Sequence, residues 1–187
     1  MEVIEIVEPF LFTLTSFINF LCLALSLWLG FYIVTRSPRS RVSWLASGTL
    51  WSLSGSFLNT LTYITVSPEQ GTLPWWWGWS AAFAAPFWFH MSVFLIPSKL
   101  ASKQRPLVIL VYFLTLNFVA MEAYTTWVFA GATAKPPIYN SAQRPGPLYL
   151  LFGLFLIVVP ALALYNLRLS WKQAKSLPIQ RQFLTLL

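Results

Sequence analysis

The stretch PFLFTLTSFINFLCLALSLWLGFYIVTRSPRSR, residues 9–41, joins a long uncharged apolar run to a cluster of arginines. An α-helix rises about 1.5 Å per residue, so about 20 apolar residues cross the ~30 Å hydrocarbon layer of a membrane. The run from Pro9 to Thr35 is long enough, and basic residues are typical of a helix end that meets a charged membrane surface. The stretch therefore predicts a transmembrane helix.

The same pattern continues along the chain, because charges divide the rest into uncharged runs over residues 42–68, 70–98, 106–121 and 145–167. The run over 106–121 is long enough if the helix continues past Glu122. We expect residues 1–187 to form one all-α, polytopic membrane domain. After a basic stretch, residues 183–187 have the character of a sixth helix start, so the chain is either a fragment of a longer protein or ends in a short amphipathic helix. The five predicted transmembrane helices cover about 9–34, 43–66, 75–97, 107–129 and 148–170.

Composition excludes several other classes of protein. The chain is 57% hydrophobic and 9% charged, whereas an average soluble domain has about 25% charged residues. This argues against a soluble globule and also against a disordered chain. Asp is absent, and Cys22 and His90 are the single cysteine and histidine. We therefore expect no carboxylate-dyad active site, no Cys/His zinc site and no enzyme activity within this chain.

Basic residues predict the orientation in the membrane. Ten of the twelve follow the first, third and fifth predicted helices, and four of the five acids fall on the opposite side. The positive-inside rule then places the N-terminus outside and the basic segments in the cytoplasm. The net charge of +7 is explained by this topology, so we expect no nucleic-acid partner.

Small and weakly polar residues recur at helical spacing on the first two predicted helices. Such residues let membrane helices approach closely and hydrogen-bond across the contact. We expect these faces to contact protein, either within the chain or in a homodimer or other partner, and the rest to contact lipid. A polar ligand cleft between the two helices is the alternative. The first face contains Thr15, Asn19, Cys22, Ser26 and Gly30, and the second contains Gly48, Ser52, Gly55, Ser56 and Asn59.

The third predicted helix contains two further features. Its outer end holds a tryptophan cluster that is typical of an interfacial aromatic belt, and the cluster comprises Trp75, Trp76, Trp77 and Trp79. Pro86 falls in the middle of the same predicted helix. A mid-helix proline removes a backbone hydrogen bond, so we expect a kink there.

Glu122 is the one acid within a predicted membrane helix. An intramembrane acid is costly and commonly marks a functional or paired site. Counted from Pro106, it lies ~24 Å along its helix, near the outer edge of the hydrocarbon. One hypothesis is an outer ligand pocket of Glu122, Asn59, Tyr63 and Tyr124. The alternative is that Glu122 only packs between helices or faces the outer interface.

His90 lies in the aromatic segment Pro86-Phe87-Trp88-Phe89-His90. It could ligate a haem or a chlorophyll, but a single histidine on an aromatic helix is more often a packed, hydrogen-bonded residue. By the same counting it lies ~14 Å in depth from Glu122, too far for a direct acid/base pair. The sequence does not identify a cofactor.

The segment PFWFHMSVFLIP, residues 86–97, preceded by the tryptophans between Trp75 and Trp79, follows a helix with Trp51 and the basic turn of residues 36–41. In these features the chain resembles the N-terminal seven-helix sensor region of bacterial histidine kinases and related signalling proteins. The resemblance implies a multi-pass signal-input module of a two-component system in the bacterial inner membrane. Five of the seven helices are present, and a kinase domain would lie beyond Leu187. No catalytic residue carries over.

Three functions are compatible with these features. The first is a sensory module that detects a small apolar ligand, a lipid or a membrane state. The second is a non-catalytic accessory subunit of a larger energy-transducing or pigment-binding membrane complex. A small transporter is the third, but it predicts more ionisable groups near the membrane midplane or an inverted repeat, and the sequence shows neither.

Overall fold

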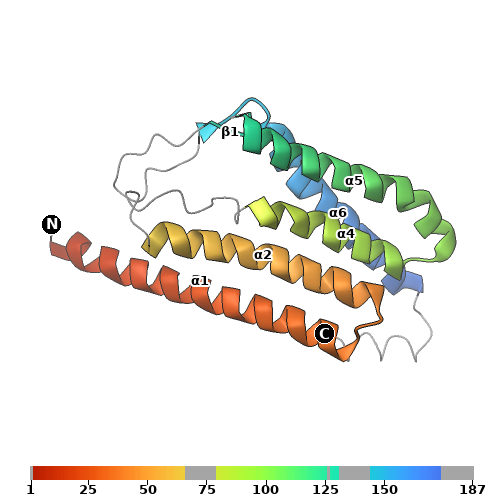
Figure 1. The fold of residues 1–187 in the computed structure, drawn as a ribbon, viewed down its shortest axis with the longest axis horizontal. Coiled ribbons are helices and arrows are strands. Elements are labelled where there is room, and N and C mark those ends of the chain that lie inside the picture. The colour runs from red at the N-terminus through yellow and green to blue at the C-terminus, as the bar shows by residue number, and fades with distance from the viewer. Residues whose placement is uncertain (1, 66–78, 126, 131–143, 174–187) are drawn as a thin grey trace.

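The computed structural model describes residues 2–65, 79–125, 127–130 and 144–173, and nearly all of them are helical. This confirms the predicted all-α class, with one pair of very short strands in addition. Two antiparallel helices form a hairpin, and the remaining helices pack beside it (Figure 1). The elements are α1 (Glu2–Arg36), α2 (Arg41–Thr65), the 3-10 helix η2 (Ser80–Phe83), α4 (Ala84–Leu95), α5 (Ser98–Tyr124), β1 (Phe129–Ala130), β2 (Arg144–Pro145) and α6 (Tyr149–Gln173).

Three helices are long and apolar enough to cross a membrane, over Phe10–Arg36, Ser98–Glu122 and Tyr149–Lys172. They belong to α1, α5 and α6, and they agree with the prediction of a helical membrane protein. The predicted spans over 43–66 and 75–97 are not among these three helices. α2 has sufficient length but is rich in Ser, Thr and Gly, and the apolar helical stretch Ser80–Leu95 is shorter.

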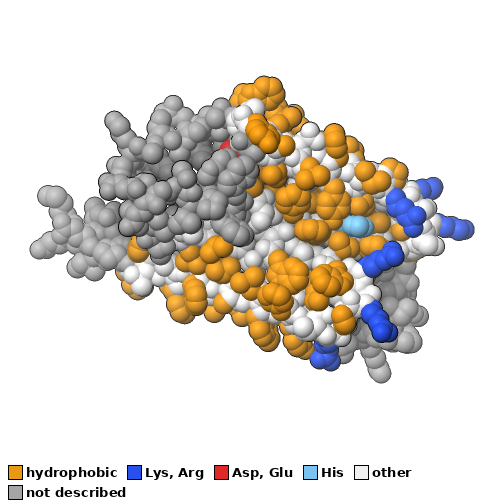
Figure 2. Space-filling model, viewed as in Figure 1, with side chains coloured by type: hydrophobic (Ala, Val, Ile, Leu, Met, Phe, Trp, Pro, Cys, Tyr) orange, Lys and Arg blue, Asp and Glu red, His pale blue; other side chains and the backbone are white. Residues whose placement is uncertain are grey.

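The lysines and arginines gather at one end of the molecule in Figure 2. They belong to the turn between α1 and α2, to the start of α5 and to the end of α6. We call this the basic end, defined by the segments Arg36–Arg41, Lys99–Arg105 and Arg168–Lys172. The α1–α2 turn, the α4–α5 turn and the end of α6 thus lie at the same end of the molecule, as the charge pattern predicted.

Helix boundaries differ from the predicted ones in several places. α1 begins at Glu2 and not at residue 9. The predicted 107–129 helix is wrong at both ends, because α5 begins at Ser98 and ends at Tyr124. At its start, Pro97 takes extended backbone and its carbonyl accepts the N–H of Leu100 and Ala101, both at 2.9 Å. The helix then continues through Pro106, which was expected to precede it.

The C-terminal end of α5 is set by Thr125, which has extended backbone. Its N–H and its hydroxyl both donate to the carbonyl of Met121. The chain then enters β1, which pairs antiparallel with β2 and so ties the end of α5 to the start of α6. Residues 131–143 between the strands, and the predicted sixth helix start at 183–187, lie outside the described residues.

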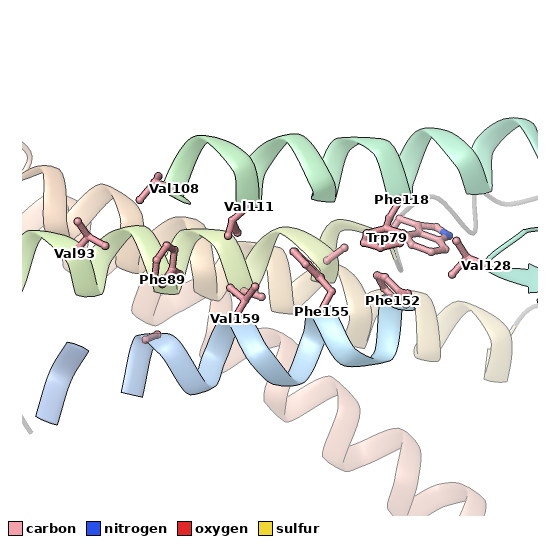
Figure 3. Close-up of a cluster of buried hydrophobic side chains, with 13 residues drawn as sticks. Trp79, Phe89, Val93, Val108, Val111, Phe118, Val128, Phe152, Phe155 and Val159 are labelled. Carbon is pink, nitrogen blue, oxygen red and sulfur yellow. The ribbon is translucent and has the colours of Figure 1, made fainter. Parts of the chain in front are cut away.

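A cluster of aromatic side chains fills the space between η2, α5 and α6 (Figure 3). Phe118 of α5 lies 5.3 Å from Phe152 and 5.5 Å from Phe155 of α6, between ring centroids. Trp79 packs 5.4 Å from Phe152. Trp79 is 9% exposed, so its predicted place in an interfacial aromatic belt is wrong; the other three tryptophans of that cluster lie outside the described residues. The buried face of α6 continues at helical spacing through Phe152, Phe155, Val159 and Ala163.

Pro86 was expected to kink a helix over 75–97. Instead it lies in the first turn of α4, which begins at Ala84 after the 3-10 turn. In the first turn of a helix the missing N–H of proline costs no helical hydrogen bond. The residue therefore accompanies a helix start and does not act as a mid-helix hinge.

A glycine allows the close approach of α1 and α2. A Cβ atom on Gly30 would lie 2.3 Å from Nε1 of Trp51, and the Ser47 hydroxyl donates to the Gly30 carbonyl at 2.7 Å. Ser26 and Gly30 are buried, whereas Thr15 is exposed. The predicted small-residue face of the first helix therefore contacts protein in the half near the basic end.

Replacing Gly30 by Ala tests this contact. We expect Gly30→Ala to lower the free energy of unfolding by about 1–3 kcal/mol, because the new methyl group overpacks the site of Trp51. Unfolding in mixed detergent micelles, followed by far-UV circular dichroism, measures it. Gly153→Ala is the matched control, since nothing lies within 4 Å of its Cβ position. Equal stability of the two variants would contradict the expectation, and Trp51→Phe should restore part of the loss.

Candidate functional site

A hydrogen-bonded cluster of polar side chains joins α4, α5 and α6 near the basic end. Asn166 of α6 donates from Nδ2 to Oε1 of Gln104 at 2.8 Å and to the Ser92 hydroxyl at 3.1 Å. Gln104 returns a bond from Nε2 to Oδ1 of Asn166 at 2.9 Å. Ser92 itself donates to the Phe89 carbonyl at 2.7 Å. We call Ser92, Gln104 and Asn166 the amide network.

Burial makes the amide network energetically important. Ser92 is 0% exposed and Asn166 is 1% exposed, so neither side chain can turn to water. A buried amide without partners costs about 1–3 kcal/mol. Both Nδ2 protons of Asn166 are used, and its oxygen accepts one bond. The cost is thus offset only while all three helices keep this mutual arrangement.

The helices position these side chains in a simple way. Asn166 continues the buried face of α6, three residues after Ala163, and Ser170 follows one turn later. The Ser170 hydroxyl donates at 2.5 Å to the carbonyl of Leu95, the last residue of α4. This carbonyl has no partner within its own helix, so α6 supplies one. α6 is therefore fixed against α4 by two separate polar contacts.

The amide network lies at the level of the charged residues. Gln104 stands between Lys103 and Arg105, and Asn166 precedes Arg168 by two positions. Lysine and arginine side chains at the ends of membrane helices reach water and charged head groups. Buried Ser92 and Asn166 thus lie close to a part of the chain with exposed charged side chains.

The predicted pocket residues do not share one environment. Glu122 is 7% exposed, whereas Tyr124 is 89% exposed. Two residues along a helix turn about 200°, so these side chains leave α5 on different sides. Asn59 is half-buried on α2, and α4 lies between α2 and α5 (Figure 1). The side chain of Tyr63 lies outside the described residues.

His90 is partly buried on α4 and belongs to an aromatic group. Its Nδ1 lies 3.3 Å from the Tyr112 hydroxyl of α5, and its ring stacks on Phe94 at 5.2 Å between centroids. The packed, hydrogen-bonded alternative for this residue therefore has a specific partner. Within the described ranges, no group of three or more His, Cys, Asp or Glu side chains could hold a metal ion.

Sequence reasoning missed Ser92, Gln104, Asn166 and Ser170. Gln104 lies outside the predicted 107–129 helix, because Pro106 was taken to precede that helix. Asn166 and Ser170 have the i, i+4 spacing that also occurs on the first two predicted helices, but the rest of α6 is so largely apolar that two polar positions do not stand out as a face. A search of each helix for paired polar positions near its charged end could have found them.

The chain matches no known protein family, no curated protein and no solved structure.

Replacing Asn166 by Ala tests the amide network. We expect Asn166→Ala to lower the free energy of unfolding by about 1–2 kcal/mol, because it leaves Gln104 and Ser92 without their partner. The same unfolding assay in micelles measures this loss. Asn117→Ala is the control, because Asn117 is half-buried and its side chain bonds within α5, to the Phe113 carbonyl at 2.7 Å.

A double-mutant cycle with Gln104→Ala separates the pairwise contribution from general packing. If the two single losses simply add up in the double variant, the side chains do not act as one unit and the network has no structural role.

Proposed function

We propose that this chain is an integral membrane signal-input module, similar to the membrane region of bacterial sensor histidine kinases. The observation that carries the proposal is the amide network, which joins α6 to α4 and α5 through directional hydrogen bonds at the basic end. A sensor needs two helix arrangements whose populations a stimulus can change. A small polar cluster near solvent is a suitable place for such an equilibrium.

The two ends of the α4–α5–α6 group differ in the kind of contact they make. Away from the basic end, Phe118, Phe152 and Phe155 make apolar contacts that tolerate small rotations. At the basic end, the hydrogen bonds of Asn166 hold only in one geometry. A tilt of α6 about the aromatic cluster would exchange those bonds for water, and this would move the cytoplasmic end of α6.

α5 carries polar residues near both of its ends. Gln104 belongs to the amide network, and Glu122 is buried eighteen positions further along, about 27 Å at 1.5 Å per residue. We propose that an apolar ligand, a lipid or a change in membrane state acts on the outer half of the bundle. α5 would transmit this input to the amide network as a rigid helix.

The resemblance to sensor regions rests mainly on residues 86–97. In the structure this segment forms most of α4, which contacts α2, α5 and α6. Phe89, Ser92 and Val93 from this segment are buried. Part of the segment that carries the resemblance therefore packs inside the bundle, where a change in helix packing would be felt. The implied setting is a bacterial inner membrane and a two-component system.

A second candidate is a non-catalytic accessory subunit of a larger membrane complex. It is favoured by α1, whose main contact is with α2 and whose other faces expose large apolar side chains. Phe17, Phe20 and Trp28 are each about 60% exposed. Lipid or a second protein, including another copy of this chain, could cover this surface.

Distance measurements distinguish the two candidates. Spin labels at Phe94→Cys and Tyr165→Cys, both exposed positions on α4 and α6, report the separation at the basic end in a Cys22→Ser background. In bilayers of short- and long-chain phosphatidylcholine, we expect two distance populations whose ratio differs between the bilayers. Asn166→Ala should shift the ratio toward the larger distance, about tenfold for a loss of about 1.4 kcal/mol.

Asn117→Ala should leave that ratio unchanged, because its bond is local to α5. One narrow population that neither the bilayer nor Asn166→Ala alters would reject the sensor and favour the accessory subunit.

Reporter fusions test the proposed five-helix topology with an outside N-terminus. Because basic loops stay in the cytoplasm, fusions after Arg39, Lys103 and Lys172 should give fluorescent green fluorescent protein and inactive alkaline phosphatase. Fusions after Glu69 and Lys135 should give the reverse. Active phosphatase after Lys103 would contradict the topology, since it would leave only some of the five helices spanning the membrane.

A further inference from the structure

The basic end is an exposed cationic surface. Every lysine and arginine of Arg36–Arg41, Lys99–Arg105 and Arg168–Lys172 is exposed. Figure 2 shows these side chains gathered at one end of the molecule, while the rest of the visible described surface is mostly apolar. The α1–α2 turn, the start of α5 and the end of α6 all contribute. The positive charge is thus concentrated in one narrow layer.

The described part of the chain holds no acid close to this layer. Glu69 and Glu122 are the only acids after Glu8, and Glu122 lies seventeen positions beyond Arg105 on α5, about 26 Å at 1.5 Å per residue. That separation exceeds the Debye length of about 8 Å at physiological ionic strength. In the part of the chain that the structure describes, these cations have no acidic partner at hand. The counter-charge must come from outside the described chain.

Exposed apolar side chains lie within or close to the segments that define the basic end. Trp44 is 52% exposed, Trp171 46%, Phe94 43% and Leu100 36%. Trp171 lies next to Lys172, and Leu100 next to Lys99. One surface therefore offers cations for an anion and, adjoining them, apolar groups for hydrocarbon.

We propose that the basic end binds anionic phospholipids, with phosphate head groups on the lysines and arginines and acyl chains on the adjoining apolar side chains. A soluble acidic protein or a nucleic acid would complement the charge but would leave the apolar groups uncovered. A phospholipid complements both. This lipid site holds for a sensor and for an accessory subunit alike, so it is independent of the proposed function.

Spin-labelled lipids test the proposal directly. The whole protein is reconstituted in phosphatidylcholine with a trace of labelled phosphatidylglycerol or labelled phosphatidylcholine, and electron paramagnetic resonance gives the fraction of label held at the protein. We expect a preference for phosphatidylglycerol of about fivefold for each cation in contact. One molar sodium chloride, which shortens the Debye length to about 3 Å, should abolish most of it.

A matched pair of variants locates the site. Lys99→Gln/Lys103→Gln removes two cations from the basic end, and Lys135→Gln/Arg144→Gln removes the two basic residues between α5 and α6 in the sequence. The first variant should lower the preference severalfold, and the second should leave it unchanged. The salt dependence of the unaltered protein keeps the test decisive even if one variant fails to fold.

Several outcomes would overturn the proposal. Equal retention of both labelled lipids excludes it, as does an equal drop in both variants. Loss of the preference on adding inorganic phosphate at constant ionic strength would assign the surface to a free phosphate. Binding of soluble polyglutamate with no preference among lipids would assign it to an acidic protein.

Discussion

The pairing of the Asn166 amide with Gln104 and Ser92 is the interaction on which the arrangement of α4, α5 and α6 depends. Asn166 is 1% exposed, and a desolvated amide is stable only when its donors and acceptor are used. Apolar contacts in a membrane do not select one rotation of a helix strongly, because lipid is as apolar as leucine. The hydrogen bonds supply that selection. They fix both the rotation of α6 and its position along its axis, and the aromatic cluster then packs within that geometry.

The α1–α2 hairpin is built on a different principle. The two helices approach closely because Gly30 has no side chain, and the ring of Trp51 occupies the space that a side chain would take. Gly48 likewise meets the ring of Phe87, with its Cβ position 3.3 Å away, so α2 packs on α4 through a second glycine. The molecule thus combines a group joined by polar side chains with a hairpin joined by close backbone approach. α4 belongs to the first group, through its contacts with α5 and α6, and also contacts α2 of the hairpin.

The sequence was sufficient to predict the helical class and the basic end, because long uncharged runs are stable in hydrocarbon and clustered arginines are stable at its charged surface. Helix ends were less predictable. Pro106 is compatible with a helix start, but α5 begins earlier, where the Pro97 carbonyl accepts the N–H groups of Leu100 and Ala101. Among the candidate residues, His90 proved to have the hydrogen-bonded aromatic neighbour that a packed histidine needs. The amide network was not predictable, since its partners are 62 and 74 positions apart and only the packing of three helices brings them together.

The order of the amide network along the chain has a consequence for biosynthesis. Ser92 and Gln104 leave the ribosome well before Asn166, their common partner on α6. During that interval, Ser92 and Gln104 have not yet met their final partner. Gln104 stands between Lys103 and Arg105, where interfacial water can serve it in the meantime. Among exposed charged neighbours, this glutamine can therefore stay hydrated until Asn166 of α6 completes the amide network.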